Sequence, residues 1–223
     1  MEIIKQALKD GQTTLSEFDS KKVLSEYKIP VTKELVAKDV NDLNQAMEKI
    51  GFPLVLKGSS SEITHKTEKG LIKIDIRTVE EATAAFEEIT TKMGDDKGGL
   101  LVQEMIKGQR ELVVGLTRDP QFGPCVMFGL GGIFTEILKD VAFRVAPLTR
   151  KDAMDIMDDI KSRKILDAVR GMEAVDREVL ADILIAVGQI GMDHDEVQEI
   201  DINPLKIRDG KPVAVDALLV LKP

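Results

Sequence analysis

VQEIDINPL, residues 197–205, alternates between polar and apolar side chains near the carboxyl end of the chain. This period of two is typical of a β-strand with one buried face. Every second side chain, from Glu199 through Asp201 to Asn203, is expected to point to one face, and Ile200 and Ile202 to the other. The stretch therefore predicts a strand that lines up oxygen-bearing side chains.

A hairpin turn determines what lies opposite this strand. Asp209-Gly210 is a strong signal for a two-residue hairpin turn, and a second apolar run follows it. With that turn, Asn203 is expected opposite Asp216, with Cβ atoms about 5 Å apart. Pro204 counts against a regular ladder, because proline leaves one backbone hydrogen bond unmade.

The predicted hairpin brings Asp201, Asn203 and Asp216 to one face. Hard oxygen ligands grouped in this way suit Mg²⁺, which usually takes one or two carboxylates together with phosphate oxygens of a substrate. The alternative is an ordinary solvated hairpin face.

The composition restricts the class of protein. The 223 residues suffice for one large or two small domains, and 43% hydrophobic and 31% charged residues fit a soluble globular protein. A net charge of −8 provides no basic surface for nucleic acid. One cysteine, no signal-peptide pattern and no apolar stretch near 18 residues indicate a cytoplasmic protein that does not span a membrane.

Helical and strand patterns alternate along the chain and predict an α/β protein made of two α+β lobes. Residues 1–104 are expected to form an N-terminal helix and a small lobe. Residues 105–223 are expected to form a larger lobe that ends in the hairpin. A cleft between two lobes is a common place for a ligand.

Candidate phosphate-binding residues lie in the first lobe. Lys57 ends an apolar strand, where it could present one charge to a phosphate or extend its ammonium into solvent. His65 follows in a polar loop, residues 58–70, that is rich in hydroxyl groups. An imidazole can accept a phosphoryl group, although a surface histidine is the simpler interpretation.

Further candidates lie at the lobe boundary and beyond it. Gln103, Glu104 and Glu111 flank the boundary, where backbone groups could bind an adenine and a carboxylate could bind ribose hydroxyls. Gly131 and Gly132, in the run GLGG, allow close approach to an anion or a tight turn. Arg144 could bind a phosphate or form a surface ion pair.

Taken together, the motifs HKTEKG (65–70), FGLGGIFTE (128–136) and DINPL (201–205) resemble the ATP-grasp superfamily. The chain is most similar to the nucleotide-binding β subunits of ADP-forming acyl-CoA synthetases, the ADP-forming acetate–CoA ligase family, over residues 29–221. One departure is Lys69, which stands where the family often has a second glycine. The resemblance implies a two-lobed ATP-grasp fold.

The resemblance also implies roles for individual residues. His65 matches a histidine that relays a phosphoryl group to ADP. The other matches are Lys57 for phosphate, Glu104, Met105 and Ile106 for the adenine hinge, Glu111 for ribose, and Asn203 and Asp216, beside Asp201, for Mg²⁺.

The reaction implied is acyl-CoA + ADP + phosphate ⇌ carboxylic acid + CoA + ATP, by way of an acyl phosphate and a phosphohistidine. ATP or ADP would be the substrate and Mg²⁺ the cofactor. A separate CoA-binding α subunit would complete a heterotetramer or similar assembly. Two alternatives remain, a succinyl-CoA synthetase-like β chain and a non-catalytic nucleotide-sensing module.

Overall fold

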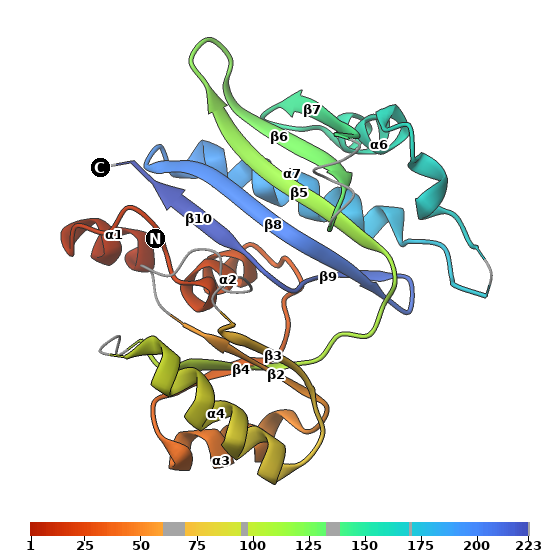
Figure 1. Ribbon diagram of the computed structural model, residues 1–223. Coiled ribbons are helices and arrows are strands. Elements are labelled where there is room, and N and C mark those ends of the chain that lie inside the picture. The colour runs from red at the N-terminus through yellow and green to blue at the C-terminus, as the bar shows by residue number, and fades with distance from the viewer. Residues whose placement is uncertain (60–69, 95–97, 133–138, 170, 223) are drawn as a thin grey trace. The chain divides into compact units, whose positions relative to one another are not determined.

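The computed structural model describes residues 1–59, 70–94, 98–132, 139–169 and 171–222, which form helices and antiparallel sheets (Figure 1). Two compact units divide the chain. Unit 1 comprises residues 1–15, 19–31 and 107–223, and unit 2 comprises residues 16–18 and 32–106. The division after Ile106 lies close to the boundary predicted after residue 104, but most of residues 1–31 cluster with unit 1 rather than with the first lobe.

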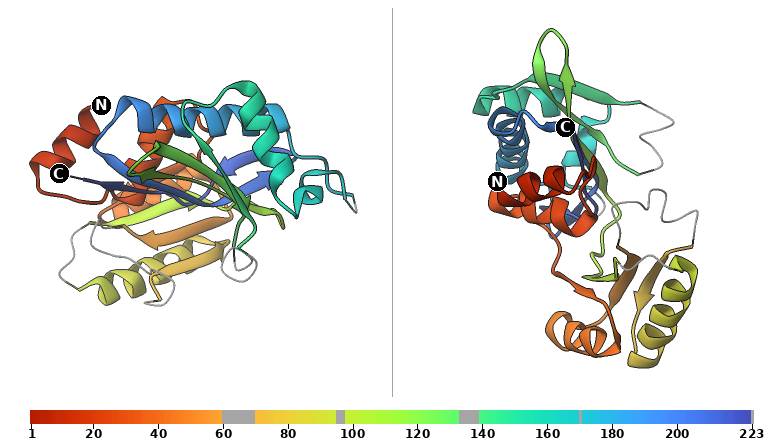
Figure 2. Two further views of the ribbon diagram at one scale, coloured as in Figure 1. Left: turned by 90° about the horizontal axis from the view of Figure 1, so that it is seen from above. Right: turned by 90° about the vertical axis from the view of Figure 1, so that its left-hand side faces the viewer.

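Unit 2 is built on a four-stranded antiparallel sheet with the order β1-β4-β2-β3. Its helices α3 and α4 cover one face of the sheet (Figure 2). Asp39 caps α3 and Thr78 caps α4, because each side chain accepts a hydrogen bond from a backbone amide in the first turn of its helix. The elements are β1 (Glu34–Ala37), α3 (Val40–Ile50), β2 (Leu54–Gly58), β3 (Ile72–Ile76), α4 (Val79–Met93) and β4 (Leu100–Glu104).

Unit 1 contains a six-stranded antiparallel sheet with the order β10-β8-β5-β6-β7, in which β9 also pairs with β8. Helices α6 and α7 lie against one face, where their apolar side chains and those of the strands form the larger core. The strands are β5 (Glu111–Asp119), β6 (Gly123–Leu130), β7 (Val141–Val145), β8 (Val197–Arg208), β9 (Lys211–Ala214) and β10 (Leu218–Leu221); the helices are α6 (Arg150–Asp159), α7 (Arg177–Asp193) and the 3₁₀ turn η1 (Arg163–Leu166).

Two helices, α1 (Glu2–Lys9) and α2 (Glu17–Glu26), form where the sequence predicts one N-terminal helix. Ile4 and Ala7 are buried in the core of unit 1, and their burial stabilises α1.

The C-terminal hairpin has the predicted register. Arg208 pairs with Lys211 across the turn. Asp209 and Gly210 both have positive φ, 49° and 74°, as a type I′ turn requires. The same register continues into the pairing of Asp201 with Leu218.

Pro204 lies at a β-bulge between β8 and β5. Leu205 pairs with Leu112 and Ile202 with Val114, so that two residues of β8 face one residue of β5. The proline therefore sits where pairing is already interrupted, which is why it does not disturb the hairpin. On the other edge of β8, the amide of Val215 donates to the Pro204 carbonyl at 3.1 Å. This bond keeps Asn203 and Asp216 at facing positions.

The predicted mixed α/β fold is confirmed. Within the described part of the chain, none of the helices has the length and apolarity needed to cross a membrane.

Candidate functional site

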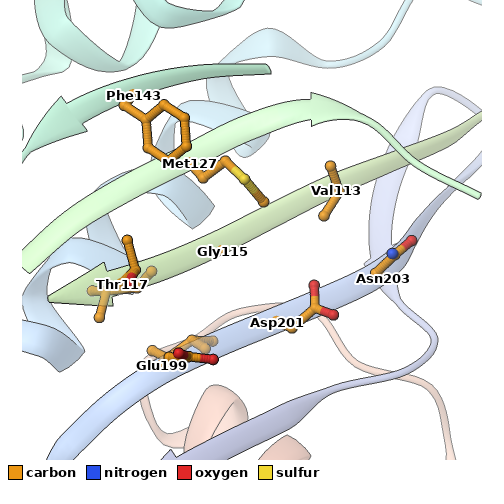
Figure 3. A pocket seen from close by; sticks show the side chains of 10 residues that line it. Val113, Gly115, Thr117, Met127, Phe143, Glu199, Asp201 and Asn203 are labelled. Carbon is orange, nitrogen blue, oxygen red and sulfur yellow. The ribbon is translucent and has the colours of Figure 1, made fainter. Parts of the chain in front are cut away.

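The face of the six-stranded sheet that α6 and α7 leave uncovered carries a row of polar side chains. Glu199, Asp201 and Asn203 follow one another along β8 (Figure 3). They line a pocket of about 370 Å³ whose other wall is apolar and includes Met127 of β6 and Phe143 of β7. The alternation predicted for residues 197–205 therefore places oxygen ligands beside a surface suited to a flat, weakly polar group.

Negative charge accumulates on this face. The pKa of Asp201 is raised to about 6, first because its surroundings desolvate the carboxylate, then because Asp216 and Glu199 lie nearby. The Asp201 residue is exposed to solvent, but it lines a pocket, and the pocket walls limit how fully water can surround its carboxylate. A divalent cation would relieve this repulsion.

The donor set fits a magnesium ion that is completed by other oxygen ligands. The Asn203 amide oxygen accepts a hydrogen bond from the Gly132 amide at 3.3 Å, which orients it, and an amide oxygen has a second lone pair. Among the residues that the structure describes, no three His, Cys, Asp or Glu side chains form a metal-binding group. The candidate ligands are thus two carboxylates and one amide, and water and phosphate oxygens would supply the rest.

Gly131 and Gly132 bring the chain against the start of β5. The Gly131 amide donates to the Glu111 carbonyl at 2.8 Å. A Cβ on Gly132, whose φ is +65°, would lie 2.5 Å from Oε2 of Glu111. Glycine at position 132 thus lets the chain approach Glu111 closely. The Glu111 carboxylate consequently lies beside Gly132, whose amide orients Asn203.

Lys206 is a residue of this face that the sequence interpretation missed. It is opposite Glu111 in the β5–β8 register, and its Nζ lies 3.1 Å from Oε1 of Glu111. The bulge at residues 203–204 returns Lys206 to the same face as Asn203. Since the bulge arises from a long-range pairing, only the register with β5 could have revealed this ion pair.

In unit 2, two predicted residues share the face that α3 and α4 do not cover. Leu54 and Leu56 of β2 enter the helix-covered core, so Lys57 points to the other face. Gln103 of β4 is on that face too, because it pairs with Val55. Both are buried, which excludes a lysine that extends into solvent.

The segment predicted as the adenine hinge is tied to its own unit. The Glu104 amide donates to the Lys33 carbonyl, and the Glu104 carboxylate accepts from the Lys33 amide, both at 2.9 Å. The Met105 amide donates to the Pro53 carbonyl at 3.1 Å, and Ile106 is buried. These bonds hold the segment in a fixed conformation.

Arg144 does not belong with the other site residues of unit 1. It pairs with Val126, whose side chain is in the core beneath the helices, so Arg144 points to the helix-covered face. There it forms an ion pair with Asp159 of α6. The ion pair is the alternative that the sequence offered for Arg144, and the phosphate role stays a prediction. His65 lies outside the described residues.

Residues 6–221 match the family described as an ATP-grasp domain, and the chain therefore belongs to the ATP-grasp family. It is 43% identical over 225 residues to the β subunit of acetate–CoA ligase [ADP-forming] I of Pyrococcus furiosus, covering 99% of this chain and 97% of that protein. The predicted resemblance to β subunits of ADP-forming synthetases is confirmed.

Two solved structures of Ca. Korarchaeum cryptofilum acetyl-coenzyme A synthetase 1 are also similar, each with 99% of both chains covered. One, in complex with coenzyme A and Ca-AMPCP, has a TM-score of 0.95 at 40% identity. The other, in complex with coenzyme A and Mg-AMPPCP, has a TM-score of 0.88 at 41% identity, and its phosphohistidine segment points towards the nucleotide binding site.

Proposed function

We propose that this chain is the nucleotide-binding β subunit of an ADP-forming acyl-CoA synthetase, a cytoplasmic acid–thiol ligase. In it, the chain moves a phosphoryl group between a phosphohistidine and ADP, which couples acyl-CoA cleavage to ATP synthesis. The structural observation that supports this most directly is the uncovered sheet face on which Asp201 and Asn203 lie beside Asp216.

The metal site is the first part of the proposal. Asn203 and Asp216 would hold Mg²⁺, and Asp201 would support it through a water molecule or directly. The ion would neutralise charge on the phosphates of the bound nucleotide. The desolvated position of Asp201 strengthens its attraction for a cation, because charges interact more strongly where water is partly excluded.

Nucleotide binding is the second part. Lys57 would contact a phosphate, and Glu111, with one oxygen already paired to Lys206, would accept hydrogen bonds from ribose hydroxyls through the other. The segment from Gln103 to Ile106 would hold the adenine. Gly131 and Gly132 would contribute by placing Glu111 and Asn203.

His65 would carry the phosphoryl group. A terminal phosphate oxygen of ADP attacks the phosphorus, the P–N bond breaks, and its electron pair returns to the imidazole as ATP forms. Phosphoryl transfer depends mainly on positioning and electrostatic stabilisation, which fits a site built from a lysine, backbone groups and a metal.

A CoA-binding α subunit is the proposed partner, in a heterotetramer or similar assembly. It would bind CoA and the carboxylic acid and form the acyl phosphate that supplies the phosphoryl group. The full-length similarity to a chain that is itself named a β subunit supports this division of labour.

Calorimetric titration of the chain with ADP tests the nucleotide proposal. We expect binding in the presence of Mg²⁺ and weaker binding when EDTA removes the metal, because the ion would then no longer neutralise the phosphate charge beside the carboxylates of the site. No binding of ADP, or equal affinity with and without Mg²⁺, would contradict the proposed site.

A further inference from the structure

Lys57 is held by a carboxylate that comes from a distant part of the sequence. Its Nζ lies 2.7 Å from Oε1 of Glu17, the first residue of α2. The side chains are only 6% and 2% exposed, so this is a buried ion pair. It joins residues that are 40 positions apart in the chain.

Stability alone is a poor reason for such a pair. The cost of removing two charges from water commonly equals or exceeds the attraction gained, and apolar residues of similar size often serve the fold as well. The two preceding residues of β2, Val55 and Leu56, are both apolar and buried, which shows that this strand accommodates such side chains. A charge at position 57 therefore suggests a functional use.

The geometry suits a lysine whose ammonium is held in one orientation. Its Nζ donates a hydrogen bond to Oε1 of Glu17 at 2.7 Å. The side chain of a lysine is otherwise flexible along four carbons, so a fixed carboxylate limits where the charge can lie. Protein kinases use the same device, because a glutamate on a helix must pair with the lysine that contacts the phosphates of ATP.

We infer that Glu17 is a positioning residue, which holds the ammonium of Lys57 in the orientation that the phosphates of the nucleotide require. The inference rests on the proposed function. Glu17 acts through Lys57 and does not touch the nucleotide itself. Glu17 and Phe18 cluster with unit 2 and the rest of the helix with unit 1.

A double-mutant cycle tests the inference. The dissociation constants of Mg-ADP and of adenosine, which has no phosphate, are measured for the unaltered chain, Glu17→Gln, Lys57→Met and the double variant. We expect Glu17→Gln to weaken ADP binding by about tenfold, because that is the change in affinity that the loss of one hydrogen bond to a charged group commonly causes. Adenosine binding should be unchanged. In the Lys57→Met background, Glu17→Gln should have no further effect on ADP.

Glu26→Gln is the matched control, because Glu26 is the exposed residue at the other end of the same helix. It should bind both ligands as the unaltered chain does. If Glu17→Gln does not fold, Glu17→Asp takes its place, because it keeps the charge on a side chain shorter by one methylene. We expect it to weaken the binding of ADP but not that of adenosine.

Equal loss of ADP and adenosine binding, or a Glu17 effect that persists without Lys57, would overturn the inference and leave Glu17 a structural residue. If the unaltered chain binds Mg-ADP no more tightly than adenosine, the phosphates contribute no affinity. The proposed function itself then fails, and the inference fails with it. The two failures are therefore distinguishable in one set of titrations.

Discussion

His65→Ala is expected to abolish ATP formation by the complex of this chain with its CoA-binding partner. The alanine side chain cannot accept a phosphoryl group, so no route remains from the acyl phosphate to ADP. ATP production from acyl-CoA, ADP and phosphate should fall to the uncatalysed background. The affinity of the chain for Mg-ADP should stay nearly unchanged, because the residues proposed to bind the nucleotide are elsewhere in the sequence.

His194→Ala is the natural control for this prediction, since the chain has only two histidines. His194 follows the last residue of α7, and its Nε2 lies 3.1 Å from the hydroxyl of Tyr27; it has no part in the proposed chemistry. Its replacement should leave ATP formation largely intact. Normal turnover of the His65→Ala complex would remove this residue from the mechanism.

Asp216→Ala is expected to weaken Mg-ADP binding by at least about tenfold. Removing a residue that only supports a metal ligand already lowers metal affinity by about tenfold or more, and a direct ligand should matter at least as much. The substitution removes one of the two proposed direct ligands of the ion. It also removes the carboxylate that contributes most, after desolvation, to the raised pKa of Asp201. The affinity for ADP measured without Mg²⁺ should change little, and calorimetry under the two conditions separates the effects.

Glu199→Ala provides the comparison on the same strand. Glu199 is an exposed acid two residues before Asp201, at the rim of the pocket, and its charge also acts on Asp201. We expect its loss to have a much smaller effect than that of Asp216. An unchanged affinity for Mg-ADP in Asp216→Ala, or equal losses in both variants, would refute a metal site on the hairpin.

Local chemistry explains what the sequence could predict. Asp209-Gly210 sets the turn and hence the register of the C-terminal hairpin, because positive φ at both positions selects one turn type. The caps at Asp39 and Thr149 fix helix starts in the same way. Family motifs added the roles that we expect for the metal ligands and for His65.

Long-range pairing explains what the sequence could not predict. The face on which Arg144 points depends on its register with β6, which no local pattern specifies. The partners of Lys57 and Glu111 are likewise set by the tertiary fold, since Glu17 and Lys206 are distant in sequence. The helix α1 forms because Ile4 and Ala7 find a core to enter, not because its short sequence strongly favours a helix.

The central claim is that this chain exchanges a phosphoryl group between a histidine and a nucleotide, and the half-reaction tests it most directly. The chain is incubated with Mg²⁺ and ATP that carries a radioactive γ-phosphate, and the protein is then analysed for covalent label. We predict a label on His65 that is stable in alkali and lost in acid, as a phosphohistidine is, and that added ADP recovers as ATP. Absence of such a label from the folded chain, or label that persists in His65→Ala, would contradict the account.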